Sequence, residues 1–119
     1  MEMPTPNANV LSKKAHIVER LSKILPAESV IFEEHETRAY ECDALTAYRC
    51  LPMIAVLPET TQQVSDVLRV CYEEGVPVVP RGSGTSLAGG AMPTADCVIL
   101  GVAKLNNVLE TDYDNRLIR

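Results

Sequence analysis

Small and hydroxyl-bearing residues gather in one short stretch of the chain, PVVPRGSGTSLAGGAMP, from Pro77 to Pro93. Four of the six glycines lie in the nine positions 82–90, together with Ser83, Thr85 and Ser86. Because glycine tolerates a positive φ and has no Cβ, successive backbone amides in such a stretch can converge on one anion. The stretch could therefore be a phosphate-binding loop, although a flexible linker could have the same composition.

Two familiar phosphate-binding patterns do not fit this stretch. The dinucleotide fingerprint G-x-G-x-x-G would require a glycine where the chain has Leu87. The nucleoside-triphosphate loop G-x-x-x-x-G-K-[ST] matches the spacing from Gly84 to Gly89, but Gly90 and Ala91 occupy its lysine and hydroxyl positions. Without that lysine, an ATPase is disfavoured.

The stretch keeps the capacity to bind phosphate through its backbone. Prolines stand on both sides of it, and both flanking runs are predicted to be buried strands, which favours a structured loop over a linker. Arg81 is the one cation beside it, and it either pairs with phosphate or locks the loop to a neighbouring element. The candidate binding residues are Arg81, Gly82, Ser83, Gly84, Thr85, Ser86, Gly89 and Gly90.

Hydrophobic periodicity places this stretch in an α+β fold, a small mixed sheet with flanking helices. The expected strands are Ser29–Phe32, Met53–Pro58, Pro77–Pro80 and Cys97–Val102, and the expected helices are Ser12–Leu25 and the segment between Thr60 and Gly75. Cys97–Val102 is apolar on both faces, which predicts a central strand. The order strand, helix, strand, loop, strand indicates a crossover that packs one helix on the sheet.

The second helix carries its own boundary signals. Thr60 and Gln63 form a capping box, and Gly75 suits the left-handed C-terminal cap. The apolar face is predicted to contain Val64, Val67, Leu68 and Cys71. After the last sheet strand, LNNVLETDYDNRLIR predicts two strand segments bent at Tyr113–Asn115, and the chain stops inside the second, so we expect it to be part of a longer domain.

Composition narrows the class of protein. The chain is 46% hydrophobic and carries a net charge of −5 without a basic run, so nucleic acid is not expected as a partner. No apolar stretch approaches the roughly 20 residues of a membrane span, and the N-terminus lacks the pattern of a secretion signal. A cytoplasmic protein, or one held at the cytoplasmic face of a membrane through partner subunits, is the expectation.

No metal or catalytic group is predicted. The four cysteines show no C-x-x-C spacing, and the two histidines are not placed to complete a metal site. Cys71 and Cys97 are expected to be buried thiols. The run from Glu33 to Asp43 holds five carboxylates around His35, which could be a metal or acid–base site, but an exposed face with a turn of helix is the favoured interpretation.

Two motifs resemble a known family, the FAD-binding domains of the vanillyl-alcohol oxidase and p-cresol methylhydroxylase type. Arg81 to Gly90 matches R-G-x-G-T-S-L-x-G-G, a loop found across that superfamily. Tyr40 to Pro52 matches the more discriminating Y-x-C-D-x-L-x-A-Y-R-x-x-P, which resembles the branch of the glycolate oxidase FAD subunit and the D-lactate dehydrogenases. The resemblance implies a helical lead-in at residues 1–28 and the first part of a FAD-binding domain at residues 29–119.

The resemblance also implies how the cofactor binds. The amides of Gly82 to Ser86 would surround the FAD pyrophosphate, with Gly89 and Gly90 beside it. Some members of the superfamily attach the flavin covalently through a histidine in this loop, but here Thr85 occupies that stretch, which implies non-covalent FAD.

The activity implied is oxidation of a small 2-hydroxy acid, glycolate or D-lactate, by hydride transfer to FAD. The electrons would pass to an iron–sulfur partner, a quinone or a cytochrome, and iron–sulfur and second flavin-type subunits are the partners implied. The catalytic groups of the family lie beyond residue 119, so this segment alone is expected to be inactive. The alternative is a non-catalytic assembly subunit that keeps the fold, and the presence or absence of flavin would discriminate between the two.

Overall fold

The structure, a computed structural model, describes residues 3–119 and contains a four-stranded sheet with helices on both faces. The strand order is β1 (Val30–Ile31), β2 (Ile54–Val56), β4 (Val98–Gly101) and β3 (Val78–Arg81). β1 runs antiparallel to β2, whereas β2 and β3 both run parallel to β4. The predicted mixed sheet and α+β class are confirmed.

β4 lies between β2 and β3, and all four of its residues are buried, as its apolar sequence predicts. Ile99 pairs with Ala55 on one side and Val79 on the other. β3 differs from the expectation of a buried strand, because it occupies the edge of the sheet and is only half-buried.

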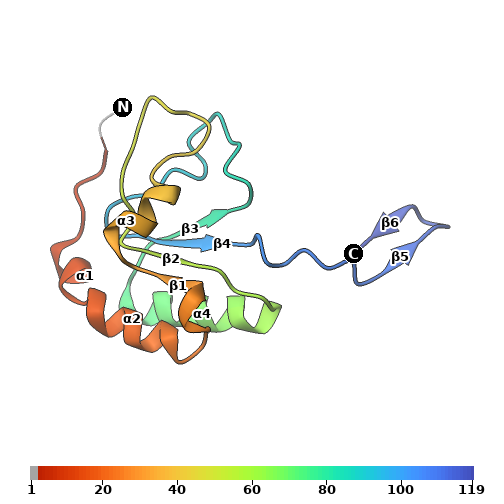
Figure 1. The fold of residues 1–119 in the computed structure, drawn as a ribbon, viewed down its shortest axis with the longest axis horizontal. Helices are drawn as coiled ribbons and strands as arrows, with labels where there is room; N and C mark the ends of the chain where they lie inside the picture. The colour runs from red at the N-terminus through yellow and green to blue at the C-terminus, as the bar shows by residue number, and fades with distance from the viewer. Residues whose placement is uncertain (1–2) are drawn as a thin grey trace.

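The two longer helices, α2 (Lys14–Ser22) and α4 (Thr61–Glu74), lie on one side of the sheet (Figure 1). Their apolar faces form the main core with side chains of β1, β2 and β4. The short α3 (Glu34–Thr37) lies on the other side, and the single turns η1 (Ala27–Ser29) and η2 (Arg38–Tyr40) flank β1 and α3. A smaller cluster around Ala55, Cys97 and Ile99, with Tyr40 packed against it, fills that second face.

The ends of α4 form as their sequence predicts. The Thr60 hydroxyl oxygen accepts a hydrogen bond from the Gln63 amide at 3.1 Å, and the Gln63 side chain accepts one from the Glu59 amide at 2.7 Å. At the other end Gly75 is left-handed, with φ +68°. One predicted core residue is wrong: Leu68 is 44% exposed and Val70 is buried instead, because the face that meets the sheet is centred on Val67, Val70 and Cys71.

The N-terminal helix is shorter and starts earlier than predicted. The chain forms α1 (Ala8–Ser12), capped by the Asn7 side chain on the Asn9 amide, and then α2 after a break at Lys13. Three apolar residues of this region, Ile17, Leu21 and Leu25, are buried in the main core.

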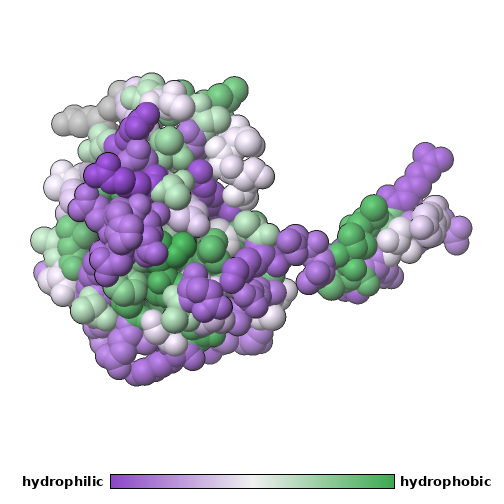
Figure 2. Space-filling view, viewed as in Figure 1, coloured by the Kyte–Doolittle hydropathy of each residue, from purple (hydrophilic) through white to green (hydrophobic). Residues whose placement is uncertain are grey.

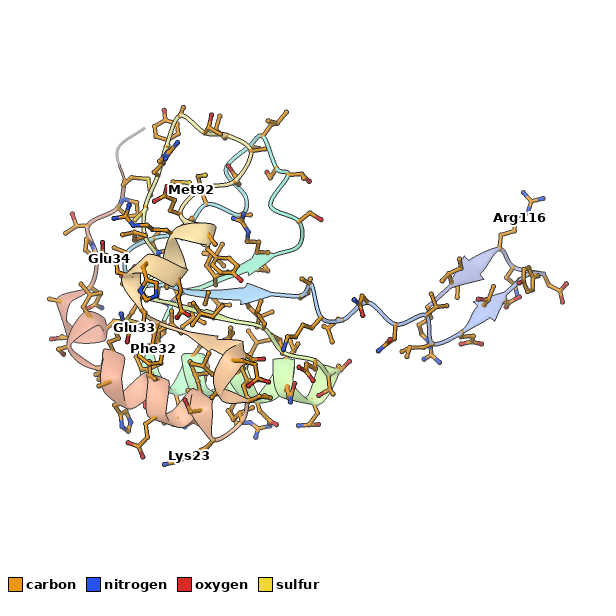
Figure 3. The ribbon with its side chains drawn as sticks, viewed as in Figure 1. Lys23, Phe32, Glu33, Glu34, Met92 and Arg116 are labelled. Atoms are coloured by element: carbon orange, nitrogen blue, oxygen red, sulfur yellow. The ribbon has the colours of Figure 1, made fainter. Side chains whose placement is uncertain are left out.

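A hairpin of β5 (Thr111–Asp112) and β6 (Leu117–Ile118) ends the chain, with its turn at the predicted bend. An extended segment carries it away from the sheet (Figure 1), and apolar residues are exposed at its base (Figure 2). Arg116 lies at the tip with a φ of +53° and points away from the domain (Figure 3). None of the helices in residues 3–119 has the length and apolar character of a membrane span.

Candidate functional site

The predicted phosphate loop, residues 82–90 and hereafter the glycine loop, leaves the carboxyl end of β3. In open sheets with parallel strands, ligands bind outside the carboxyl ends of those strands. Gly82, Ser83, Thr85 and Gly90 are exposed, and the chain returns through a buried Ala91 and Pro93 to enter β4. The loop is therefore anchored at both ends and open to solvent between them, which confirms a structured loop.

Gly84 occupies a position that no other residue would fill without strain. Its φ is +71°, in the left-handed region. A Cβ at this position would lie 2.3 Å from Nη2 and 2.5 Å from Cζ of Arg81. The backbone conformation favours glycine, and a side chain here would also have to displace the Arg81 guanidinium.

Arg81 reaches back across the sheet edge to a distant segment. Its Nη1 donates a hydrogen bond to the Cys42 carbonyl oxygen at 2.8 Å, and its Cζ lies 5.7 Å from the centroid of the Tyr40 ring. Of the two roles that the sequence leaves open for Arg81, the lock to a neighbouring element is the one that these contacts describe.

The two halves of the glycine loop differ in the hydrogen bonding of their amides. Counting acceptors within residues 3–119, the amides of residues 82–87 have none. The Ser86 hydroxyl oxygen accepts from the amides of Ala88 at 3.2 Å and Gly90 at 3.4 Å, so it shapes the second half of the loop.

The remaining glycines also fit a ligand that approaches closely. Gly82 has no positive φ, and a Cβ there would meet no described atom within 4 Å, so the fold itself does not require glycine at this position. Gly89 has a φ of +77° and is equally open. A diphosphate has only acceptor atoms, and amides that lack acceptors among residues 3–119 can supply the donors it needs. The residues present therefore fit the diphosphate of FAD.

Two residues outside the glycine loop support it, and sequence reasoning used them only as markers of family resemblance. They are Tyr40 and Cys42, which hold the Arg81 guanidinium. Asp43, the next residue, is buried, and its Oδ1 accepts from the Leu45 amide at 2.9 Å. The Y-x-C-D motif was the available signal, but its spacing does not show that it contacts the loop.

Of the five carboxylates around His35, Glu33, Glu34 and Glu36 are exposed, as favoured, whereas Glu41 is half-buried and Asp43 is buried. Glu33 and Glu34 lie along the outside of the segment that leads into α3 (Figure 3), and Glu34 pairs with Arg38 at 3.3 Å. Within the described part of the chain, no group of acidic, histidine and cysteine side chains is placed to hold a metal ion.

Cys71 and Cys97 are buried thiols, as predicted. Burial raises the pKa of Cys71 to about 11 and also raises the pKa of Cys97. Because the thiolate is the nucleophilic form, neither cysteine is suited to chemistry.

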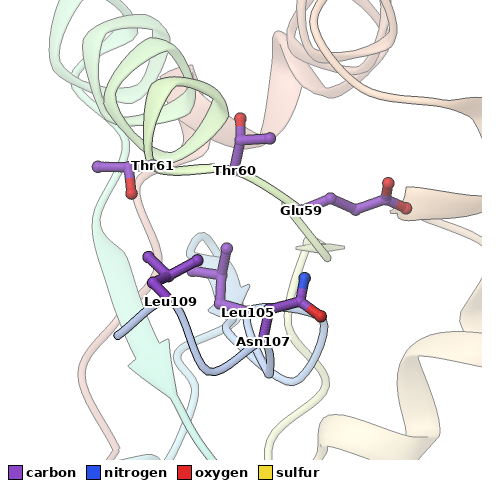
Figure 4. A pocket seen from close by; sticks show the side chains of 6 residues that line it. All are labelled: Glu59, Thr60, Thr61, Leu105, Asn107 and Leu109. Carbon is purple, nitrogen blue, oxygen red and sulfur yellow. The ribbon is translucent and has the colours of Figure 1, made fainter. Parts of the chain in front are cut away.

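A pocket of about 410 Å³ lies at the N-terminus of α4, and none of its lining residues belongs to the predicted binding residues Arg81 to Gly90. Figure 4 shows the side chains that line it, which are Glu59, Thr60, Thr61, Leu105, Asn107 and Leu109. Glu59 accepts a hydrogen bond from Lys104 at 2.7 Å, and Thr60 is used in the helix cap. The pocket thus lies where the segment after β4 leaves the domain.

Comparison with known proteins agrees with this site. Residues 52–119 match the family described as FAD binding domain. The chain is 37% identical over 106 residues to glycolate oxidase subunit GlcD of Escherichia coli, which covers 89% of this chain and 21% of the relative. It is 34% identical over 105 residues to D-lactate dehydrogenase of Archaeoglobus fulgidus, which covers 84% and 22%.

A solved structure of p-cresol methylhydroxylase with substrate bound has the same fold, with a TM-score of 0.67 at 21% identity over 92% of this chain and 22% of that one. The chain spans about a fifth of the length of the curated relatives it matches. It belongs to the family of FAD binding domains, and it is similar to glycolate oxidase subunit GlcD and to D-lactate dehydrogenase.

Proposed function

We propose that the full-length protein is a flavin-dependent D-2-hydroxyacid dehydrogenase that oxidises glycolate or D-lactate. The observation that carries the proposal is the glycine loop, in which the amides of residues 82–87 have no acceptor among residues 3–119. The relatives named glycolate oxidase subunit and D-lactate dehydrogenase support the substrate class.

In this proposal the amides of Gly82 to Ser86 hold the FAD diphosphate, and Gly89 and Gly90 let the chain pass close beside it. Non-covalent binding is part of the proposal, because Thr85 occupies the stretch of the loop where some members of the superfamily attach the flavin through a histidine. When bound, FAD supplies the acceptor for the hydride that leaves C2 of the substrate. The base that takes the hydroxyl proton and the residues that hold the substrate carboxylate belong to the protein beyond residue 119.

The proposal extends to organisation and partners. Residues 1–28 are a helical lead-in, and residues 29–119 are the first part of the FAD-binding domain, joined through a shared core that includes Ile17, Leu21 and Val67. By similarity to a glycolate oxidase subunit, iron–sulfur and second flavin-type subunits are the proposed electron acceptors. A cytoplasmic location, with membrane contact only through those subunits, belongs to the same proposal.

The test is to purify the full-length protein and record its visible spectrum. We expect flavin absorbance that bleaches anaerobically when glycolate or D-lactate is added to the native protein. In a separate sample, heat or acid should release all of the flavin into solution. L-Lactate serves as the control substrate and should leave the spectrum unchanged. A folded protein that stays colourless after FAD is added would contradict the proposal and favour a non-catalytic assembly subunit.

A further inference from the structure

We propose that Arg81 is a positioning residue, which joins the glycine loop to the segment Tyr40–Cys42 so that both move as one unit, and that it does not bind phosphate directly. The role in cofactor binding rests on the proposed function. The joining of the two segments does not, because it follows from contacts within the chain.

Three contacts hold the guanidinium of Arg81 in place. It donates to the Cys42 carbonyl oxygen at 2.8 Å, lies over the Tyr40 ring at 5.7 Å, and fills the space where Gly84 would have a Cβ. These groups come from segments 39 residues apart, so one side chain connects them. A planar guanidinium suits this position, because it can lie on an aromatic ring and donate hydrogen bonds at the same time.

The charge arrangement agrees with this role. Within residues 3–119, Arg81 has no carboxylate within ion-pair distance, whereas Arg20, Arg38, Arg49, Arg69 and Arg119 all do. The Arg81 guanidinium is instead held by a backbone carbonyl and an aromatic face. Its side chain thus fixes backbone, and the exposed amides of the loop remain the groups that face a ligand.

The contact with Gly84 makes the proposal measurable. An alanine at position 84 would push the guanidinium away from Tyr40 and Cys42, in addition to straining its own backbone. If Arg81 is first replaced by methionine, which is unbranched and flexible, the added Cβ has less to displace. The two substitutions are therefore expected to be non-additive, as residues in contact usually are.

The experiment uses the full-length protein without cofactor and the variants Arg81→Met, Arg81→Lys, Gly84→Ala and the Arg81→Met/Gly84→Ala pair. Arg69→Met is the matched control, because Arg69 makes an exposed pair with Asp66 on α4. Thermal unfolding and amide hydrogen exchange are measured for each, followed by the rate at which FAD dissociates from the reconstituted protein.

We expect Arg81→Met and Arg81→Lys to speed hydrogen exchange both in the segment Tyr40–Cys42 and in the glycine loop. Arg69→Met should change the exchange of neither. Gly84→Ala should lower the Tm less in the Arg81→Met background than alone. FAD should dissociate at least about tenfold faster from both Arg81 variants, which corresponds to about 1.4 kcal/mol. If Arg81→Met does not fold, Tyr40→Leu tests the same contact more mildly and should speed exchange in the glycine loop.

Several results would overturn the proposal. One is hydrogen exchange that changes in only one of the two segments, and another is additive Tm shifts for Arg81→Met and Gly84→Ala. A third is an Arg81→Lys protein that retains FAD as the parent does, because that would indicate that the positive charge of residue 81 acts directly on the phosphate. Non-additive Tm shifts in a protein that binds no FAD would leave the positioning role standing and refute the proposed function alone.

Discussion

At the scale of single residues, Gly84 and Gly75 share a left-handed backbone, with φ of +71° and +68°, but differ in their surroundings. Gly84→Val should abolish FAD retention in the full-length protein, because it strains the loop by about 1–3 kcal/mol and displaces Arg81. The ratio of flavin to protein absorbance after gel filtration measures the loss.

Gly75→Ala is the matched control for that prediction. Its Cβ would meet no described atom within 4 Å, so it carries the backbone strain of a left-handed residue without touching the glycine loop. It should lower the Tm and leave the flavin ratio unchanged. A Gly84→Val protein with the parent's flavin content would show that the loop does not approach the cofactor at residue 84.

At the scale of elements, α4 depends on its N-terminal cap. Thr60→Ala removes the acceptor for the Gln63 amide and should destabilise the protein by about 1 kcal/mol, as loss of such caps usually does. Thr60→Ser keeps a hydroxyl in the same place and should be close to the parent. Urea denaturation followed by circular dichroism measures both, and equal losses in the two variants would show that the hydroxyl bond is not what stabilises the helix.

Elements with local signals could be predicted from the sequence. The Thr60 cap and the Gly75 terminus define α4, and the all-apolar run of β4 identifies the centre of the sheet. The break at Lys13 could not be predicted, because it depends on an Asn7 cap that begins a separate short helix. The exposure of Leu68 depends on how α4 is rotated against the sheet, and tertiary packing sets that rotation.

In the candidate site, too, local features could be predicted from the sequence and long-range contacts could not. The glycine loop was predictable because its residue types state what its backbone can do. The hydrogen bond from Arg81 to Cys42 could not be predicted, because the two residues are 39 positions apart. Predicting it would require knowing that the segment before β2 lies beside the end of β3. Sequence therefore predicted the candidate ligand-binding groups and left undetermined the segment that supports them.

At the scale of the whole molecule, Glu74 holds the N-terminal helices onto α4. Its side chain is 11% exposed and accepts from Arg20 at 2.6 Å and Lys13 at 3.3 Å, with His16 at 3.2 Å. The hydrogen bond from Arg20, followed by that from Lys13, holds the Glu74 pKa below its ordinary value of 4.5, against the opposing effect of burial.

Because the folded pKa of Glu74 is the lower one, its ion pairs stabilise the fold above about pH 4.5 and are lost as the pH falls through the folded value. Glu74→Gln should therefore lower the Tm most at neutral pH, with the difference from the parent shrinking on acidification. Glu28→Gln is the control, since Glu28 is exposed and has no ion pair in the described part of the chain. A Glu74→Gln difference that stays constant from pH 7 to about pH 3 would contradict the assignment.

The glycine loop by itself covers only one part of a large dinucleotide, which sets a limit on what residues 1–119 can bind. A ligand held on one side by exposed amides keeps most of its surface in water and gains little apolar burial to offset the loss of its rotational and translational freedom. Residues 1–119 alone should therefore bind FAD more weakly than about 1 μM, the affinity that about −8 kcal/mol would give.

Titration calorimetry with FAD measures this affinity, and pyrophosphate serves as the matched ligand that contacts only the loop. Binding of FAD that is as weak as that of pyrophosphate would indicate that the loop amides supply the whole interaction, whereas micromolar or tighter binding of FAD would mean that another surface of residues 3–119 holds the flavin or the adenosine.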